Sequence, residues 1–194
     1  TLAVPYAWGD VSGTVFEEAR SVSRSGLTDA RAKFSINLLG NPAVGLREFV
    51  KTPRKTIVGT SLTVTPPTGQ YDGSKLINLG TNRWGFKPEV GVSVPKGPWD
   101  FDAYFGVWLF TDNPDFFPGG QTRSQDRVVA LQGHASYTFK PRLWAAIDAT
   151  WYEGGGASVD GGEPAGAMNN SRLGATVSFP MGRRQSFKVA YSSG

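Results

Sequence analysis

The chain has 194 residues, enough for one domain of ordinary size, and its formal net charge of +4 is spread along its length. It contains no Lys/Arg-rich run of the kind that binds nucleic acid, and the absence of cysteine excludes disulfides and thiolate metal sites. No window approaches the roughly 18–20 consecutive apolar residues of a transmembrane helix. A membrane-spanning β-strand would escape that test, because only every second residue faces lipid.

The first third of the chain contains one clear strand and several connections. Near the N-terminus we expect a short turn at Trp8–Asp10 and a longer outside loop at Ser21–Ala30. Residues Arg31–Leu38 then alternate between polar and apolar side chains, which is the period of a β-strand. The next connection, Gly40–Lys55, is long. Its stretch Pro42–Val50 predicts a short helix, because proline stands near the start and apolar residues are loosely spaced.

Polar and apolar residues also alternate in six later segments, at residues 89–94, 101–110, 129–139, 143–152, 172–179 and 186–192. The longer segments keep this period over about 9–11 residues, the length of a tilted membrane strand, whereas globular strands average about five or six. Every charge in these segments lies on the polar face. A cation on the lipid side at mid-depth would cost about 2–4 kcal/mol, so this placement favours a transmembrane β-barrel.

The polar face of these segments is predicted to line the interior of the barrel. The candidate lining residues are Glu89, Asp102, Gln132, His134, Asp148, Arg172 and Lys188. Side chains of both charges could pair across strands and plug a narrow barrel. Facing rows of opposite charge could equally select small solutes in an open channel. Trp108 and Trp144 lie on the same face and are expected to fill part of the lumen.

The connections between these segments alternate in length. Short ones at Pro95–Pro98, Lys140–Pro141 and Pro180–Arg184 alternate with long ones at Pro66–Gly85, Asp112–Asp126 and Glu153–Asn170. Bacterial up-and-down barrels have short periplasmic turns and longer extracellular loops. The predicted fold is therefore an all-β, antiparallel, up-and-down transmembrane β-barrel, with about eight to ten strands in this chain. A soluble β-sandwich, with the apolar face as its core, is the alternative fold.

Aromatic residues gather near the ends of the predicted strands. The residues in question are Trp84, Trp99, Phe101, Tyr137, Phe139, Trp151 and Phe179. Their amphipathic rings favour the headgroup level of a bilayer, so we predict that they form the two aromatic girdles of the barrel.

Several stretches resemble a known family. They are Thr63–Asp72, Leu76–Glu89, Val107–Asn113, Leu131–Phe139, Ser171–Thr176 and Gly182–Arg184. They are similar to outer-membrane β-barrel transporters labelled "MetA-pathway of phenol degradation". The resemblance implies a barrel of about a dozen strands, preceded by a signal peptide. Residues 1–194 are then expected to form a single barrel domain that lacks strands at both ends, with no signal peptide in this chain. Neither catalytic residues nor a phenolic cargo follow from it.

Sites with chemistry were sought independently of that resemblance. His134 is the sole histidine, which excludes a two-histidine metal motif. Ser136, His134 and Asp148 could form the Ser-His-acid triad of an outer-membrane lipid hydrolase. The sequence contains no motif that marks a nucleophile or an oxyanion hole. The acidic residues of the long connections lack calcium-loop spacing. We therefore expect no enzyme activity, no metal and no cofactor.

The sequence thus predicts a channel or transporter in the outer membrane of a Gram-negative cell. Its expected partners are outer-membrane lipid and lipopolysaccharide, together with a small solute of hydrophobic or aromatic character; no nucleic acid is expected. A structural barrel with a plugged lumen and a soluble binding module are the other hypotheses. The sequence does not choose a solute or an oligomeric state.

Overall fold

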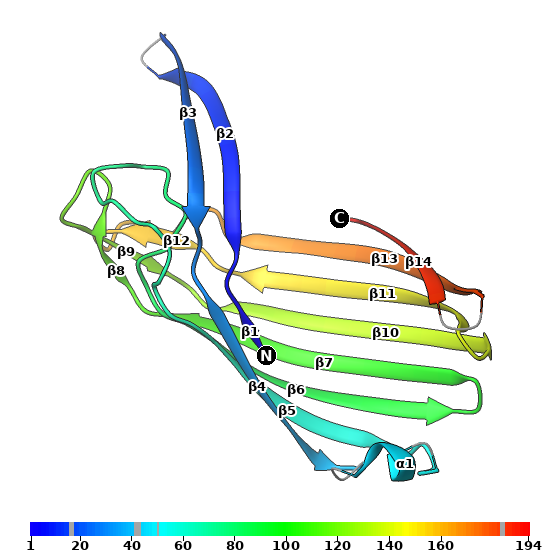
Figure 1. Ribbon diagram of the computed structural model, residues 1–194. Coiled ribbons are helices and arrows are strands. Elements are labelled where there is room, and N and C mark those ends of the chain that lie inside the picture. The colour runs from blue at the N-terminus through cyan, green and yellow to red at the C-terminus, as the bar shows by residue number, and fades with distance from the viewer. Residues whose placement is uncertain (16–17, 41–43, 50, 183–184) are drawn as a thin grey trace.

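One large antiparallel sheet dominates the computed structural model, which describes residues 1–194 except 16–17, 41–43, 50 and 183–184 (Figure 1). In spatial order its nine strands are β1 (Leu2–Ala3), β4 (Arg31–Leu39), β5 (Ile57–Thr65), β6 (Gly85–Lys96), β7 (Trp99–Phe110), β10 (Val128–Lys140), β11 (Leu143–Gly154), β13 (Met168–Met181) and β14 (Gln185–Ser193). The six alternating segments of the sequence fall within β6, β7, β10, β11, β13 and β14. The predicted antiparallel up-and-down order is therefore confirmed.

The strands are long enough to cross a bilayer. β7 has 12 residues. At about 3.3 Å per residue it extends about 40 Å, and a tilt of about 40° leaves about 30 Å along the membrane normal. That length matches the hydrocarbon thickness of a bilayer, about 30 Å.

The connections alternate between the two ends of the sheet as predicted. Short turns join β6 to β7, β10 to β11 and β13 to β14 at one end. At the other end lie three long connections, residues 66–84, 111–127 and 155–167, which we call the loop cap. The loop cap carries a small sheet of β8 (Asn113–Phe116), β9 (Gln121–Gln125) and β12 (Ala157–Val159). Its strands gather beyond the ends of the main sheet (Figure 1).

The exceptional connection between β4 and β5 contains the predicted helix in shortened form. Helix α1 spans Leu46–Phe49 at the end of the sheet that carries the short turns (Figure 1). Residues 41–43 and 50 of the predicted stretch Pro42–Val50 lie outside the described residues. No helix in the described part of the chain is long and apolar enough to cross a membrane.

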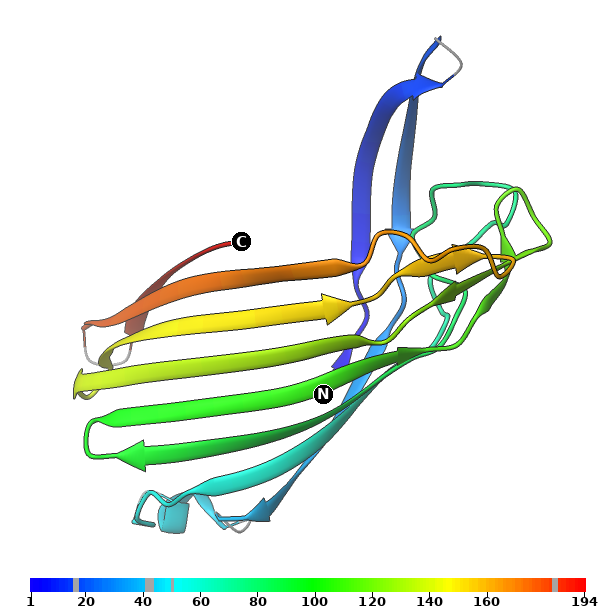
Figure 2. The ribbon, with the colours of Figure 1, turned by 180° about the vertical axis from the view of Figure 1, so that it is seen from behind.

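Both N-terminal predictions were wrong, because residues 21–27 of the predicted loop Ser21–Ala30 also lie in a strand. Trp8–Asp10 is not a turn but part of β2 (Tyr6–Val15), which pairs with β3 (Glu18–Leu27) in a hairpin outside the main sheet. Gly9 and Asp10 suggest a turn because both are common turn residues. Here Gly9 pairs with Arg24 and Asp10 with Ser23, so the cross-strand ladder overrides local preference. The hairpin projects from the loop-cap end of the sheet in both views (Figures 1 and 2).

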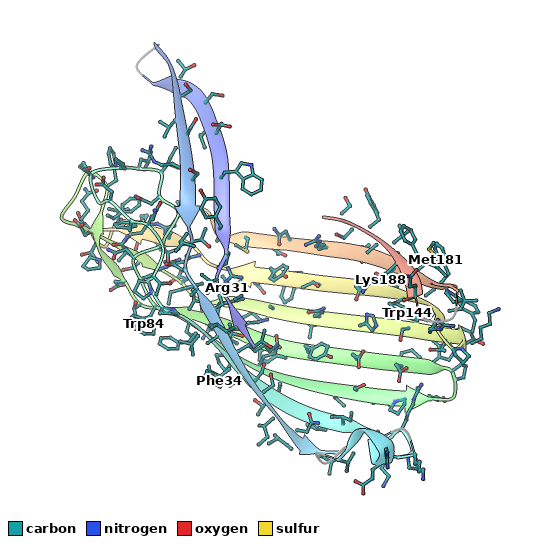
Figure 3. All side chains as sticks on the ribbon, in the orientation of Figure 1. Arg31, Phe34, Trp84, Trp144, Met181 and Lys188 are labelled. Carbon is teal, nitrogen blue, oxygen red and sulfur yellow. The ribbon has the colours of Figure 1, made fainter. Side chains whose placement is uncertain are left out.

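The two faces of the sheet differ sharply, and the apolar face is uncovered. Among the described residues, the buried apolar side chains are Val128, Ala130 and Ala146. Large apolar side chains such as Ile147 and Leu173 are instead about two-thirds exposed, at 65% and 67%. Phe34 on β4 is equally exposed (Figure 3). A soluble sandwich would bury this face under a second sheet, whereas a transmembrane barrel presents it to lipid.

Candidate functional site: the polar inner face and the loop cap

The candidate lining residues occupy one face of the main sheet. Residues opposite each other in an antiparallel ladder share a face. Asp102 on β7 pairs with His134 on β10, which pairs with Asp148 on β11. The three side chains therefore form one row across three strands, and His134 Nδ1 lies 2.5 Å from Asp148 Oδ1. We call this polar face the inner face.

His134 has a carboxylate partner but no nucleophile beside it. Ser136 lies two positions along the same strand, and side chains at that spacing are separated by about 6.5 Å. No hydrogen bond found in the described part of the chain joins Ser136 to His134. The pair that does form, His134 with Asp148, is a polar contact of the inner face, and the geometry gives no support to the Ser136–His134–Asp148 hydrolase hypothesis.

Glu89 is the centre of a second polar group on the inner face. Its Oε1 lies 3.0 Å from Lys33 Nζ on β4, and its Oε2 lies 2.5 Å from Lys87 Nζ on its own strand. Ser61 on the intervening β5 donates to Oε1 at 3.4 Å. The carboxylate therefore links β4, β5 and β6, and it compensates one of two neighbouring cations.

Five of the seven candidate residues border two hollows, and His134 and Lys188 border neither. One hollow, of about 280 Å³, is lined by Lys33, Glu89 and Asp102 among others. The other, of about 360 Å³, is lined by Gln132, Asp148 and Arg172. Asp102 borders the first hollow and Asp148 the second, and His134 lies opposite both of them in the strand ladders.

Arg172 and Lys188 contact neighbours near the last strand. Arg172 Nε donates to Ser192 Oγ at 3.1 Å. Lys188 Nζ lies 5.8 Å from the ring centre of Trp144, close to the short-turn end (Figure 3). The ring of Trp108, at the opposite end, lies 5.7 Å from Lys87 Nζ. Both tryptophans thus hold cations of the inner face by cation–π contact. That all these residues line a pore remains a prediction.

The aromatic residues predicted as girdles lie on the opposite, apolar face. At the short-turn end, Trp99 stacks on Phe101 and meets Tyr137 edge-on, with ring centres 5.6 and 4.9 Å apart. Tyr137 contacts Phe139 at 4.8 Å, and Phe179 contacts Phe187 at 5.3 Å.

At the loop-cap end, Trp84 stacks on Phe86 with ring centres 6.1 Å apart. Trp151 Nε1 donates to Asn169 Oδ1 at 3.0 Å. The rings are therefore concentrated toward the two strand ends, where the headgroup regions of a bilayer would lie.

The loop cap is ordered by a buried carboxylate that the sequence did not reveal. Asp29 precedes β4 and is only 7% exposed. Its Oδ1 accepts from the backbone N–H of Gly69 at 2.8 Å. Its Oδ2 accepts from the N–H and the hydroxyl of Thr81 at 2.8 and 2.7 Å. One carboxylate thus fixes two points of the connection at residues 66–84.

A buried amide continues this network into the second long connection. Asn113 is 3% exposed, and its Oδ1 accepts from Asn82 Nδ2 at 2.8 Å. Its own Nδ2 donates to the hydroxyl of Tyr71 at 2.8 Å, and that hydroxyl donates to the carbonyl of Asp115. The first two long connections are therefore joined side chain to side chain.

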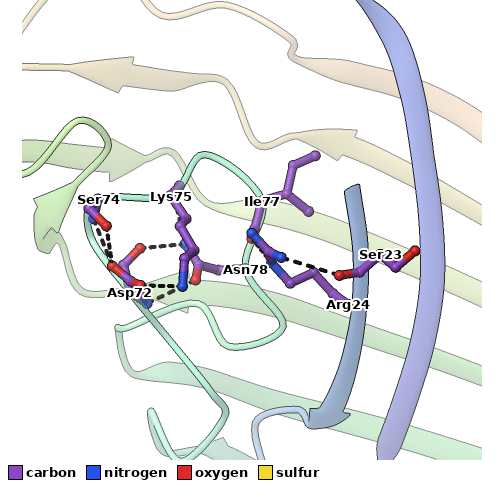
Figure 4. Close-up of polar contacts among 7 residues, drawn as sticks. All are labelled: Ser23, Arg24, Asp72, Ser74, Lys75, Ile77 and Asn78. Atoms are coloured by element: carbon purple, nitrogen blue, oxygen red, sulfur yellow. Dashed lines mark hydrogen bonds and ion pairs between the residues drawn. The ribbon is translucent and has the colours of Figure 1, made fainter. Parts of the chain in front are cut away.

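Asp72 stabilises a turn within the first long connection, residues 66–84. Its carboxylate forms an ion pair with Lys75 at 2.5 Å and accepts from the N–H and hydroxyl of Ser74 (Figure 4). The hydrogen bond from Lys75, followed by those from Ser74, lowers the pKa of Asp72 to about 2. Beside it, Arg24 of β3 donates to the carbonyl of Ile77 at 3.4 Å, so the hairpin contacts the loop cap.

Arg83 is a buried cation at the base of the loop cap, two residues before β6. Its guanidinium lies 4.4 Å above the ring of Phe110, and Nη2 donates to Gln125 Oε1. Burial, and then the nearby charge of Arg123, lowers the pKa of Arg83 to about 10, so the group remains charged at neutral pH. Neither Asp29 nor Arg83 was a predicted site residue, because both lie in connections without periodic pattern.

Comparison with known proteins supports this architecture. An outer membrane channel from Pseudomonas putida F1 has a similar structure, with a TM-score of 0.72 and 19% sequence identity. The match covers 96% of this chain and 66% of that channel, so this chain spans about two-thirds of the channel's length. At this identity the likeness establishes a shared fold, that of an outer-membrane β-barrel. None of the curated proteins compared matches the sequence. The family model described as "Putative MetA-pathway of phenol degradation" matches residues 1–194, and the chain therefore belongs to that family.

Proposed function

We propose that residues 1–194 act as one domain, the wall of an outer-membrane channel for small solutes of hydrophobic or aromatic character. The observation that carries this proposal is the opposed character of the two faces of one sheet. The outer face exposes side chains such as Phe34 and Ile147, and the inner face holds charged groups such as Glu89 and Asp148. A sheet of this kind separates lipid from a polar interior.

The surroundings follow from the same arrangement. The apolar face contacts outer-membrane lipid, with lipopolysaccharide around the end that carries the loop cap. Long connections face outward in bacterial barrels, so the loop cap lies at the cell surface of a Gram-negative bacterium. A solute then meets the loop cap before it reaches the inner face. Transport is a passive process in this proposal, and no residue serves as a catalyst.

A structural barrel with a plugged lumen is the second candidate, and one observation favours it. Lys33 and Lys87 close on Glu89 from two strands, which is how side chains fill the interior of a narrow barrel. Such a barrel would fold in the membrane and would not conduct.

The test begins with the full-length protein folded in detergent. A barrel is expected to migrate on a gel differently before and after boiling, and to be extracted only with detergent. The same preparation is then inserted into planar bilayers in KCl and into liposomes for swelling assays. Stepwise current, with swelling in small solutes, supports the channel. A folded protein that is silent in both assays identifies the plugged barrel, and a protein that remains in solution without detergent refutes both candidates.

A further inference from the structure

A cavity beneath the loop cap has aromatic walls and is bordered by a buried cation, Arg83. It has a volume of about 390 Å³, and its walls include Trp108, Phe110 and Tyr152 together with Arg83 and Thr65. Sites for small molecules commonly measure about 300–1,000 Å³ and have apolar walls with few polar groups. The size and lining of this cavity fit a small aromatic ring.

Two polar atoms in the walls of this cavity have no partner. In the described part of the chain, the buried side-chain polar atoms without a hydrogen bond are Arg83 Nη1 and Thr65 Oγ1. Both residues line the same cavity. A buried donor that forms no hydrogen bond is costly, and more so when it is charged. Their coincidence in one cavity indicates a place where a ligand oxygen completes the hydrogen bonding.

The arrangement around Arg83 leaves one nitrogen for such an oxygen. Arg83 is only 8% exposed, and its Nη2 donates a hydrogen bond to Gln125 Oε1. The guanidinium carbon lies 4.4 Å from the centre of the Phe110 ring, and this cation–π contact restrains the group. Because Nη1 is buried, a ligand oxygen in the cavity reaches it only when the Arg83 side chain turns toward the cavity. A guanidinium held in this way pairs best with a carboxylate.

The charges around the cavity also favour an anion. Its lining contains Arg31 and Arg83 as cations and Asp29 as an anion. The carboxylate of Asp29 already accepts three hydrogen bonds from Gly69 and Thr81, so it is not a free partner for Arg83. No ion pair to Arg83 occurs among the described residues. Asp29 and Asp112 act on Arg83 through their charge without forming an ion pair with it, and a carboxylate in the cavity would supply that ion pair.

From these observations we propose that the cavity beneath the loop cap binds a small aromatic carboxylate. The carboxylate is held by Arg83, with Thr65 as a hydroxyl donor, and the ring lies among Trp108, Phe110 and Tyr152. The site deepens the proposed function and rests on it for its role, since it would hold the solute between the cell surface and the inner face.

The experiment compares benzoate with benzamide, which has the same shape without the charge, on the full-length protein in detergent by isothermal titration calorimetry. Benzoate is expected to bind at least about tenfold more tightly than benzamide, as one charge-assisted hydrogen bond requires. Arg83→Gln is expected to weaken benzoate about tenfold or more, and Thr65→Val to weaken it by a smaller factor. The matched control Arg127→Gln removes an exposed cation from the same end of the sheet and is expected to leave binding unchanged.

Equal affinity for benzoate and benzamide would overturn the proposal, as would undiminished binding by Arg83→Gln or an equal loss in Arg127→Gln. If Arg83→Gln does not fold, the comparison of the two ligands on the unmodified protein and on Thr65→Val still decides. Conductance in KCl is recorded on the same preparation. Current without benzoate binding would refute only the proposed binding site. Benzoate binding without current would refute only the proposed channel function.

Discussion

Glu89 sets the balance of charge on the inner face, because its carboxylate lies at ion-pair distance from both Lys33 and Lys87. Glu89→Gln would leave Lys33 and Lys87 uncompensated on the inner face. The channel is then expected to become more selective for anions, since fixed charges that line a pore attract the opposite ion. The measurement is the zero-current potential in a KCl gradient across a planar bilayer.

Glu153→Gln is the matched control for that change in selectivity. It removes the same charge near the end of β11, where Glu153 lies on the face opposite to Tyr152. A shift of the potential in Glu89→Gln but not in Glu153→Gln locates the effect on the inner face. Equal shifts, or none, would contradict the assignment of Glu89 to the pore.

Ile147 tests the outer face at a single residue. It is 65% exposed on β11, and Ile147→Arg would place a cation where lipid is expected. Such a change at mid-depth costs about 2–4 kcal/mol of folding free energy. Gln132→Arg places the same side chain on the inner face of the neighbouring β10 and is expected to cost far less. Unfolding by urea in lipid vesicles measures both, and equal losses would mean that the two faces are wrongly assigned.

At the scale of elements, the connection that holds α1 is attached to its neighbour by one arginine. Arg54 Nη2 donates to the carbonyl of Trp99 at 3.1 Å and to Asp100 Oδ1 at 2.7 Å, beside the turn between β6 and β7. The Arg54 side chain is half exposed, so the pair contributes at most about 1 kcal/mol. Arg54→Ala is expected to leave the unfolding midpoint nearly unchanged but to hasten protease cleavage within residues 44–56. Arg47→Ala changes an exposed residue of the same connection and is not expected to hasten cleavage. Equal cleavage of both variants would contradict the role of Arg54.

Elements of the sheet were predictable where one physical rule acts along the chain. The segment at residues 101–110 alternates because one face meets lipid and the other a polar interior, and it falls within β7 as predicted. The hairpin of β2 and β3 was missed because its two strands lie outside the main sheet, so no single buried or lipid-facing side imposes a period on them. A helix was predicted at Pro42–Val50 from the proline near its start and the spacing of its apolar residues. In the structure α1 spans only Leu46–Phe49.

Only the candidate site residues that lie on strands could be predicted from the sequence. The face shared by His134 and Asp148 follows from alternation, and their 2.5 Å contact requires only the register of two adjacent strands. Asp29 is different, because it bonds to Gly69 and Thr81, which are 40 and 52 residues away in the sequence. Contacts of this range depend on how the long connections fold over the sheet, and no local pattern encodes them.

At the scale of the whole molecule, the two ends of the sheet are built differently. The short-turn end contains two- and three-residue connections and the aromatic contacts around Trp99. The other end is covered by the loop cap, which is held by buried hydrogen bonds of Asp29 and Asn113. In the proposed channel, a solute would pass the cap before it reaches the inner face. The rate of entry would then depend on how firmly the cap is held.

Asp29→Ala tests this dependence of entry on the cap. The change leaves the N–H groups of Gly69 and Thr81 without their acceptor, which costs about 1–3 kcal/mol and raises the population of the opened cap by about five- to 150-fold. Hydrogen exchange at these two amides is expected to accelerate by that factor. Single-channel current is expected to grow larger and noisier, while the unfolding midpoint of the strand ladders stays the same. Asp112→Ala, an exposed change at the same end that also removes a carboxylate near Arg83, should alter neither readout. Faster exchange with unchanged current would mean that the solute path avoids the cap, and it would contradict the dependence of entry on the cap.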